Sequence, residues 1–360
     1  MTHPEQTITD IDKRSHLRSP GVGGPVSQVV HIRDESDIGL ARRSAARVAA
    51  DAHMSENDAG ALALVTTEAA NNIARYGRDG LIILRSIGEN DEKTVEMIAA
   101  DKGPGIADLN RAFSDGYSTG GTPGKGLGAI KRMSRHFDMW SIADGGTSLV
   151  ARFGAKVESS ALPSDIGVVC SSLAGETSCG DAWMVEETPE GTLIALADGL
   201  GHGHDAAIAA DTAIDLMRRR KRSSLIDILQ LTHNALRSTR GAAIQIAVVE
   251  RGKGTVRSAG VGNISASVIT RGAFKGVPSQ PGIVGHQMPT VREVTLPWER
   301  DSVLVMHSDG ISAKWKIDSY PGIAMRDPAL LAAVIYRDSA RARDDATVVT
   351  YRATAAGDAR

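Results

Sequence analysis

The chain has 360 residues, of which 42% are hydrophobic and 23% are charged, and its formal net charge is −2. This length favours two domains, each large enough to bury its own core. The near balance of charge leaves no concentrated basic face for nucleic acid, and only two cysteines, Cys170 and Cys179, exclude a disulfide framework. No apolar run approaches the ~18 residues of a membrane span, and the start is polar and rich in Gly and Pro. We therefore expect a cytoplasmic protein with a disordered leader and no membrane partner.

The first half of the chain carries helical and strand patterns in alternation. Small apolar residues recur at helical spacing, short apolar runs are bounded by turn residues, and eight glycines crowd into 101–128. The order expected is helices at 38–54 and 57–76, strands at 80–87 and 93–100, a mobile loop at 101–128, a helix at 127–137, and strands at 138–143 and 147–155.

The second half reads as runs of strands interrupted by paired helices. We expect strands at 166–173, 181–187 and 191–197, two helices within 204–238, four or more further strands, a helix at 328–339 and a last strand at 346–351. This order favours an α+β layered sandwich over a doubly wound parallel sheet. The expected divisions are a leader at 1–27, a domain at 28–155, a linker at 156–165, a domain at 166–354 and a tail at 355–360.

The helix expected at 57–76 carries polar side chains on one face. Glu68 and Asn72 are four residues apart and share that face, whereas Asn71 points about 100° away. An Asn can complete the coordination of a Mg²⁺ ion held by nucleotide phosphates, and a neighbouring carboxylate can deprotonate an attacking hydroxyl. Taken alone, however, Glu68 is explained as well by a solvent-exposed helix position as by a catalytic role.

Two glycine-rich stretches follow this helix. Asp101 ends a strand and opens a turn with Gly103 and Gly105, where its carboxylate could accept a hydrogen bond from an exocyclic amino group such as that of adenine. The next stretch runs directly into a helix, whose free N–H groups and positive dipole end suit phosphates. Its residues are Gly124, Gly126, Leu127 and Gly128.

The segments TEAANNIARYG, DKGPGI and GKGLGAIKR, in this order, resemble the N, G1 and G2 boxes of the GHKL (Bergerat) ATP-binding fold over about 28–155. GGTSLV resembles the last motif of that fold and would place Thr147 near the adenine. The resemblance is closest to the RsbT- and RsbW-type serine/threonine kinases of partner switching, where a Glu in the position of Glu68 is the proposed base. A histidine kinase is disfavoured, and Tyr76, where a His is common, receives no role.

Acidic residues recur in the second half at the ends of apolar runs. Asp198 follows TLIALA and Asp309 follows SVLVMHS, so both carboxylates stand at the tip of a buried strand. Each Asp-Gly pair alone is typical of a turn. Together, buried carboxylates are costly unless cations neutralise them, and oxygen ligands favour Mg²⁺ or Mn²⁺.

The motifs GD, ADGxGHG, SDG and RDDATVV resemble, in this order, the PPM phosphatases of the SpoIIE and RsbX type over about 166–352. The resemblance implies an α-β-β-α sandwich with two Mn²⁺ or Mg²⁺ ions. Asp345 stands where Asn is common and is left out of the ligand set, and Asn263 is interpreted as a turn residue. The implied metal ligands are Asp181, Asp198, the carbonyl of Gly199, Asp309 and Asp344.

These resemblances imply a signalling protein that uses ATP with Mg²⁺ to phosphorylate Ser or Thr of STAS-domain partners and cations to dephosphorylate them. Two alternatives remain open: the first domain senses ATP and gates the phosphatase, or it is a module that binds a sigma factor. A homodimer is a further candidate assembly. His202 and His204 could ligate zinc, but no soft third ligand accompanies them, so we expect them to shape the rim of the aspartate site. The basic run at 218–222 is expected at a helix end, with contact to an acidic partner left open.

Overall fold

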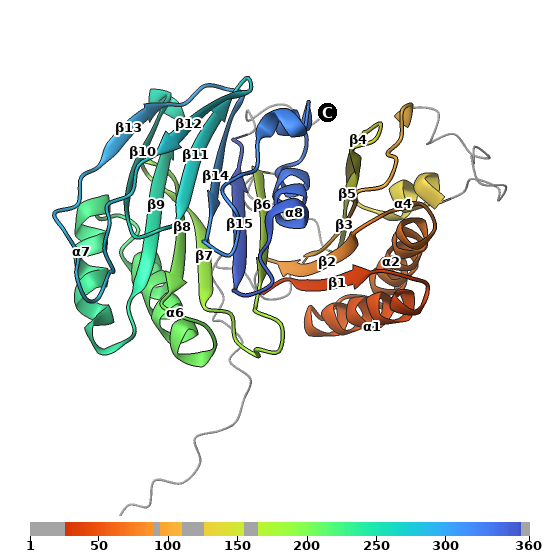
Figure 1. The fold of residues 1–360 in the computed structure, drawn as a ribbon, viewed down its shortest axis with the longest axis horizontal. Coiled ribbons are helices and arrows are strands. Elements are labelled where there is room, and N and C mark those ends of the chain that lie inside the picture. The colour runs from red at the N-terminus through yellow and green to blue at the C-terminus, as the bar shows by residue number, and fades with distance from the viewer. Residues whose placement is uncertain (1–25, 89–93, 110–125, 155–164, 354–360) are drawn as a thin grey trace, which may run out of the picture.

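The computed structural model describes residues 26–88, 94–109, 126–154 and 165–353. Almost all of the expected leader and linker, the tail and most of the expected mobile loop, including Gly124, lie outside these ranges. The described elements stack in successive layers, with α1 and α2 at one side of the molecule and α6 and α7 at the other (Figure 1). In the described ranges, no helix combines the length and apolar character needed to cross a membrane.

The first half forms one antiparallel sheet with the strand order β1-β2-β3-β5-β4. Helices α1 and α2 pack together and cover one face of it. The α2 helix begins after Ser55, whose hydroxyl accepts a hydrogen bond from the Asp58 amide, and it ends before Gly77. The elements are β1 (Gln28–Ile32), α1 (Ser36–Asp51), α2 (Glu56–Tyr76), β2 (Gly80–Ile87), β3 (Thr94–Asp101), α4 (Gly126–Met133), β4 (His136–Ile142) and β5 (Gly146–Gly154).

The second half is a sandwich of two five-stranded sheets. The sheet β13-β10-β9-β8-β7 is covered on its outer face by α6 and α7, and the sheet β12-β11-β14-β15-β6 is covered by α8. The elements are β6 (Ile166–Ser171), β7 (Asp181–Thr188), β8 (Gly191–Gly199), α6 (His204–Arg219), α7 (Leu225–Ala235), β9 (Ala242–Glu250), β10 (Thr255–Val261), β11 (Ser265–Thr270), β12 (Ala273–Val277), β13 (Val294–Pro297), β14 (Ser302–His307), α8 (Pro328–Ser339) and β15 (Ala346–Tyr351), with short 3₁₀ turns at Leu236–Ser238, Arg251–Lys253, Ile317–Ser319 and Ile323–Met325.

Helix α8 belongs to both halves of the molecule. Its sequence PALLAAVIY is buried from Pro328 to Tyr336, which is the pattern of a helix covered all round. One side packs on β6 and β15, and the other packs on the face of the first sheet that α1 and α2 leave uncovered. Strand β2 is correspondingly buried on both faces, with Leu81 and Ile83 toward α8 and Ile82 and Leu84 toward α2.

A buried ionic network joins the halves beside the start of α8. Both Nη atoms of Arg152 in β5 donate to the Asp327 carboxylate, at 2.6 and 2.9 Å, and Nε of Arg152 donates to Glu96 at 2.7 Å. Asp327 also caps α8 by accepting from the Ala329 amide, and it contacts Nε2 of His136 at 2.8 Å. Burial alone would raise the pKa of Asp327, but the charge of Arg152 and these hydrogen bonds hold it well below its usual range.

The α+β class and the layered-sandwich architecture are confirmed, whereas two local expectations differ from the structure. The helix predicted to reach residue 137 ends at Met133, because His136 already pairs with Arg152 in the ladder between β4 and β5. Strand β1 had not been predicted, since its five residues are too few to show a period. Helix α6 begins at His204 and ends at Arg219, inside the basic run, as expected.

Candidate active sites

The acidic residues of the second half meet at one end of the sandwich. Asp181 opens β7 and lies opposite Asp198, near the end of β8. Asp309 follows β14 and Asp344 precedes β15, and these two strands are neighbours in the facing sheet. Antiparallel pairing thus delivers two carboxylates from each sheet to the same end of the molecule.

Burial and mutual repulsion shape the electrostatics of this acidic cluster, which comprises Asp181, Asp198, Asp309 and Asp344. Burial and the charge of Asp198 raise the pKa of Asp181 well above its usual range. Burial, followed by the charges of Asp309 and Asp344, raises the pKa of Asp198 to about 7. Burial and Asp344 likewise raise the pKa of Asp309. In the folded chain the ionised form of these carboxyls is therefore disfavoured, and a bound cation would stabilise it.

Neighbouring polar groups orient the acidic cluster. The hydroxyl of Ser308 donates to Oδ2 of Asp181 at 2.7 Å and accepts from the Thr347 amide. Nδ2 of Asn263 donates to Oδ2 of Asp309 at 2.7 Å. Asn263 is therefore more than the turn residue that the sequence indicated, since it fixes one carboxylate of the cluster.

Residues next to the cluster hold the surrounding loops through contacts with backbone atoms. Asp345 accepts from the amides of Leu173 and Gly180, both at 2.8 Å, so both of its oxygens are engaged in holding loops. A Cβ at Gly199 would lie 2.1 Å from the carbonyl oxygen of Ala206, and one at Gly310 would lie 1.9 Å from that of Asp345. Glycine is thus required at both positions, because another backbone segment passes too close for a side chain.

The donor chemistry of the cluster fits divalent cations. Among the described residues, no three His, Cys, Asp or Glu side chains form a ready-made metal cage. The fit rests instead on oxygen donors whose pKa values are raised by burial and by the negative charge of neighbouring carboxylates. His202 pairs through Nδ1 with Glu176 at 2.8 Å, and His204 begins α6.

In the first half, the polar face of α2 meets the start of α4. A Cβ at Gly126 would lie 3.3 Å from Oε2 of Glu68 and 3.5 Å from Nδ2 of Asn72. The structure therefore brings Glu68 and Asn72 together beside the N-terminus of α4, to which Leu127 and Gly128 also belong. A side chain at Gly126 would be tight against Glu68 and in ordinary van der Waals contact with Asn72, so the glycine leaves room beside this polar face.

The turn after β3 lies against the end of α2. Oδ1 of Asp101 accepts from the Gly103 amide at 2.7 Å, and a Cβ at Gly103 would lie 2.6 Å from the carbonyl oxygen of Tyr76. Gly105 adopts a φ of +69°, with the Ile142 carbonyl where a side chain would stand. Thr147 is the cross-strand partner of Asp101. Asp101 and Thr147 thus lie side by side, with Asp101 at the C-terminal end of α2.

Comparison with known proteins matches both halves. The sequence model of the histidine kinase-like ATPase domain matches residues 33–153, and that of stage II sporulation protein E (SpoIIE) matches residues 188–354. Serine/threonine-protein kinase RsbT of Bacillus subtilis (strain 168) is 34% identical over 122 residues, which cover 34% of this chain and 92% of RsbT.

Phosphoserine phosphatase RsbX of the same organism is 23% identical over 140 residues, which cover 38% of this chain and 70% of RsbX. A solved structure described as "The bacterial stressosome: a modular system that has been adapted to control secondary messenger signaling" is 30% identical, with a TM-score of 0.50, and its match covers 52% of this chain and 98% of that one. The chain joins an RsbT-family ATPase domain to a SpoIIE-type phosphatase domain. The second half is accordingly a PPM-type serine/threonine phosphatase domain.

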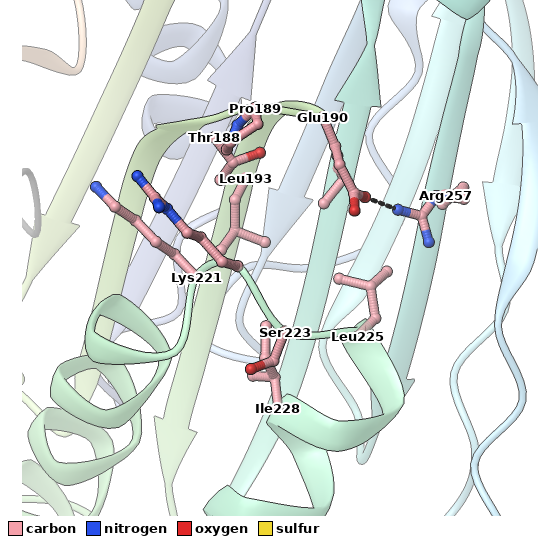
Figure 2. Close-up of a pocket in the computed structure, with 11 residues that line it drawn as sticks. Thr188, Pro189, Glu190, Leu193, Lys221, Ser223, Leu225, Ile228 and Arg257 are labelled. Carbon is pink, nitrogen blue, oxygen red and sulfur yellow. Dashed lines mark hydrogen bonds and ion pairs between the residues drawn. The ribbon is translucent and has the colours of Figure 1, made fainter.

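A separate cavity of the phosphatase domain lies away from the acidic cluster, under the turn between β7 and β8 (Figure 2). It holds about 80 Å³ and is closed on one side by the start of α7. Glu190 and Arg257 form an ion pair at its edge, and Nζ of Lys221 reaches Glu186 at 2.6 Å. The basic run at the end of α6 is therefore partly neutralised within the chain.

Proposed function

We propose that the phosphatase domain hydrolyses phosphoserine or phosphothreonine on a protein substrate. In this proposal Asp181, Asp198, Asp309, Asp344 and the carbonyl of Gly199 hold two Mn²⁺ or Mg²⁺ ions. When bound, the cations supply an activated water for attack on the phosphate ester. Ser308 and Asn263 hold two of the carboxylates in place. The observation that carries the proposal is the convergence of four strand-end carboxylates, three of which, Asp181, Asp198 and Asp309, have raised pKa values.

We propose further that the ATPase domain is a protein serine/threonine kinase. Asn72 would bind the Mg²⁺ that accompanies ATP, and Glu68 would accept the proton of the attacking hydroxyl. The remaining residues would bind the nucleotide: Asp101 and Thr147 the adenine, and Gly103, Gly105, Gly124, Gly126, Leu127 and Gly128 the adjoining backbone and phosphates. The contact of Glu68 and Asn72 with Gly126 supports this assignment.

The proposed partner is a STAS-domain protein of a cytoplasmic partner-switching pathway. The RsbT and RsbX relatives carry the two opposed activities in their names, and the stressosome structure supports this setting. In this proposal, residues 28–155 and 166–354 are the two domains and residues 156–165 link them. Opposed activities on one chain imply that the substrates differ or that one state of the molecule suppresses the other.

The phosphatase is tested with a phosphorylated STAS protein and Mn²⁺. We expect hydrolysis that Asp198→Asn and Asp309→Asn each reduce to background. Asp318→Asn is the matched control, because Asp318 is exposed and is not one of the proposed ligands. Full activity in both cluster variants would contradict the metal assignment.

The kinase is tested with γ-labelled ATP in an Asp198→Asn background, where hydrolysis of the product is silenced. We expect label on the STAS protein, lost in Glu68→Gln and kept in Glu56→Gln, whose side chain lies in the exposed first turn of the same helix. Nucleotide binding without label transfer would contradict the kinase and leave the ATP-sensing alternative.

A further inference from the structure

The C-terminal end of α8 contacts the backbone of a residue in the proposed nucleotide site. Nη1 of Arg337 donates to the carbonyl oxygen of Asp101, the last residue of β3. A Cβ at Gly146 would lie 2.9 Å from the same nitrogen, so the guanidinium lies against the point where β3 and β5 begin to separate. The Arg337 side chain is only 2% exposed. A buried cation is thus used to hold the backbone of the residue proposed to read adenine.

The next residue, Asp338, holds this end of the helix in place. It accepts from Nε of Arg337 at 2.8 Å and from the hydroxyl of Tyr320 at 2.8 Å, and it forms an ion pair with Lys102 at 3.5 Å. Lys102 directly follows Asp101. Arg337 and Asp338 therefore contact two consecutive residues, Asp101 of the proposed nucleotide site and its neighbour Lys102, from the phosphatase side.

The same segment runs on to the acidic cluster within a few residues. The Ser339 carbonyl accepts from the Ser312 amide, and Ala340 forms a β-bridge with Ile311. The Arg341 amide donates to the carbonyl of Gly310 at 2.8 Å, next to Asp309. One short hydrogen-bonded segment, residues 337–344, thus touches Asp101 at one end and carries Asp344 at the other.

The path combines a packed helix with a hydrogen-bonded turn. Helix α8 is buried from Pro328 to Tyr336, and the network of Arg152 and Asp327 holds its start. Residues 340–343 are exposed, but the contacts with Ser312, Ile311 and Gly310 tie this turn to the segment that follows Asp309. A connected set of contacts therefore runs from Asp101 to Gly310. Coupling between two sites requires such a connected element together with a preference of each ligand for one arrangement of it.

We propose that Arg337 is a positioning residue that couples nucleotide binding at Asp101 to cation binding at the acidic cluster. This inference rests on the two sites assigned under the proposed function and adds their regulation. Because coupling free energies are reciprocal, a bound nucleotide changes the cation affinity by the same factor by which the cations change the nucleotide affinity.

The test is a mutant cycle in the full-length chain, read as the affinity for the fluorescent nucleotide mant-ADP at fixed saturating Mn²⁺. Asp309→Asn disables the cation site while the Mn²⁺-nucleotide complex stays the same in every sample. We expect Asp309→Asn to change the Kd of mant-ADP about fivefold or more in the wild-type background. In the Arg337→Met background the same change should be less than about twofold, which is the non-additivity of coupled residues.

Arg326→Met is the matched control. Arg326 also joins the two halves, through Asp138 at 3.3 Å, but it lies before α8 and off the path to Gly310. The coupling should persist in Arg326→Met and be partly restored in Arg337→Lys, which keeps a cationic donor. Far-UV circular dichroism spectra of the variants that match the wild-type spectrum in the absence of ligands would establish that folding is intact.

A second readout does not depend on Asp309→Asn. Saturating ADP should slow amide hydrogen exchange over residues 339–345 in the wild-type chain and not in Arg337→Met. Absence of mant-ADP binding to the wild-type chain would overturn the nucleotide site and the coupling together. Binding with equal Kd in the wild-type and Asp309→Asn chains, or coupling unchanged in Arg337→Met, would overturn the coupling alone.

Discussion

The two halves of this molecule assemble their sites in different ways. In the ATPase domain, Glu68 and Asn72 lie one turn apart on a single helix, so local geometry alone brings them together. In the phosphatase domain, Asp181 and Asp344 come from different sheets and are separated by most of the domain sequence. The first arrangement needs one intact helix, whereas the second needs the complete sandwich.

The difference extends to energetics. The acidic cluster gathers like charges in a buried place, which costs folding free energy until cations neutralise it. The junction between the halves also buries charges, but there each carboxylate faces an arginine. The carboxylates of the acidic cluster are thus available to bind cations, whereas those of Asp327 and Glu96 are already paired with Arg152.

The largest effect is expected at the junction. Asp327→Ala leaves Arg152 buried without one of its two carboxylate partners, so the free energy of unfolding should fall by about 3–5 kcal/mol. Urea denaturation at pH 7 measures this loss. Asp318→Ala, on the exposed surface, should stay within about 0.5 kcal/mol of the wild type. A similarly small change in Asp327→Ala would show that the junction does not depend on this ion pair.

Removal of a charge from the acidic cluster should raise the stability of the chain, in contrast to the loss expected for Asp327→Ala. Because the pKa of Asp198 is raised to about 7, the native carboxyl keeps a proton that the unfolded chain releases near pH 4. Its contribution to stability is therefore present below about pH 4 and is lost as pH rises toward 7. Without cations, Asp198→Asn should be more stable than the wild type at pH 8, on the order of 2 kcal/mol, and the two should converge at pH 4.

Cations provide the complementary measurement. Mn²⁺ at pH 8 should raise the thermal midpoint of the wild-type chain and leave that of Asp198→Asn nearly unchanged, because binding to the native state stabilises it by mass action. Equal responses of the two proteins would show that the bound Mn²⁺ is not at the cluster.

A smaller effect is expected at Asn263. Removing its amide in Asn263→Ala releases Oδ2 of Asp309, so the Mn²⁺ concentration needed for half-maximal phosphatase activity should rise about 10- to 100-fold. Asn234→Ala, on the exposed face of α7, is the control and should leave the Mn²⁺ requirement unchanged. Restoration of maximal activity by excess Mn²⁺ distinguishes orientation of the ligand from loss of the fold.

The smallest losses of stability are expected at two helix N-caps, one in each half of the molecule. Ser55 caps α2 and Ser224 caps α7, each by accepting from the amide three residues later. Ser55→Ala and Ser224→Ala should each lower stability by about 1 kcal/mol. Because the halves share α8, both variants should shift one common unfolding transition in calorimetry. Two transitions that respond separately would contradict a shared core.

The sequence predicted most of this arrangement where a pattern is local. The apolar runs predicted the strands, the alanine face predicted α6, and the Asp-Gly pairs indicated the ends of β8 and β14. It could not predict that Asn263 reaches Asp309, because that contact joins loops 46 residues apart and the turn explanation was sufficient. Nor could it predict the role of Arg337, since a buried helix between two sheets has no sequence period that separates its two faces.

The position of α8 also has a consequence for how the chain is made. The sheet of the ATPase domain buries Leu81, Ile98 and Trp140 against a helix that begins only at Pro328. At about 5–20 residues per second, a ribosome needs roughly 10–40 s to synthesise that helix after the sheet is complete. During that interval the nascent sheet presents an apolar face to its surroundings. The last segments of the chain thus complete the first domain, so premature termination should leave a fragment that needs chaperones.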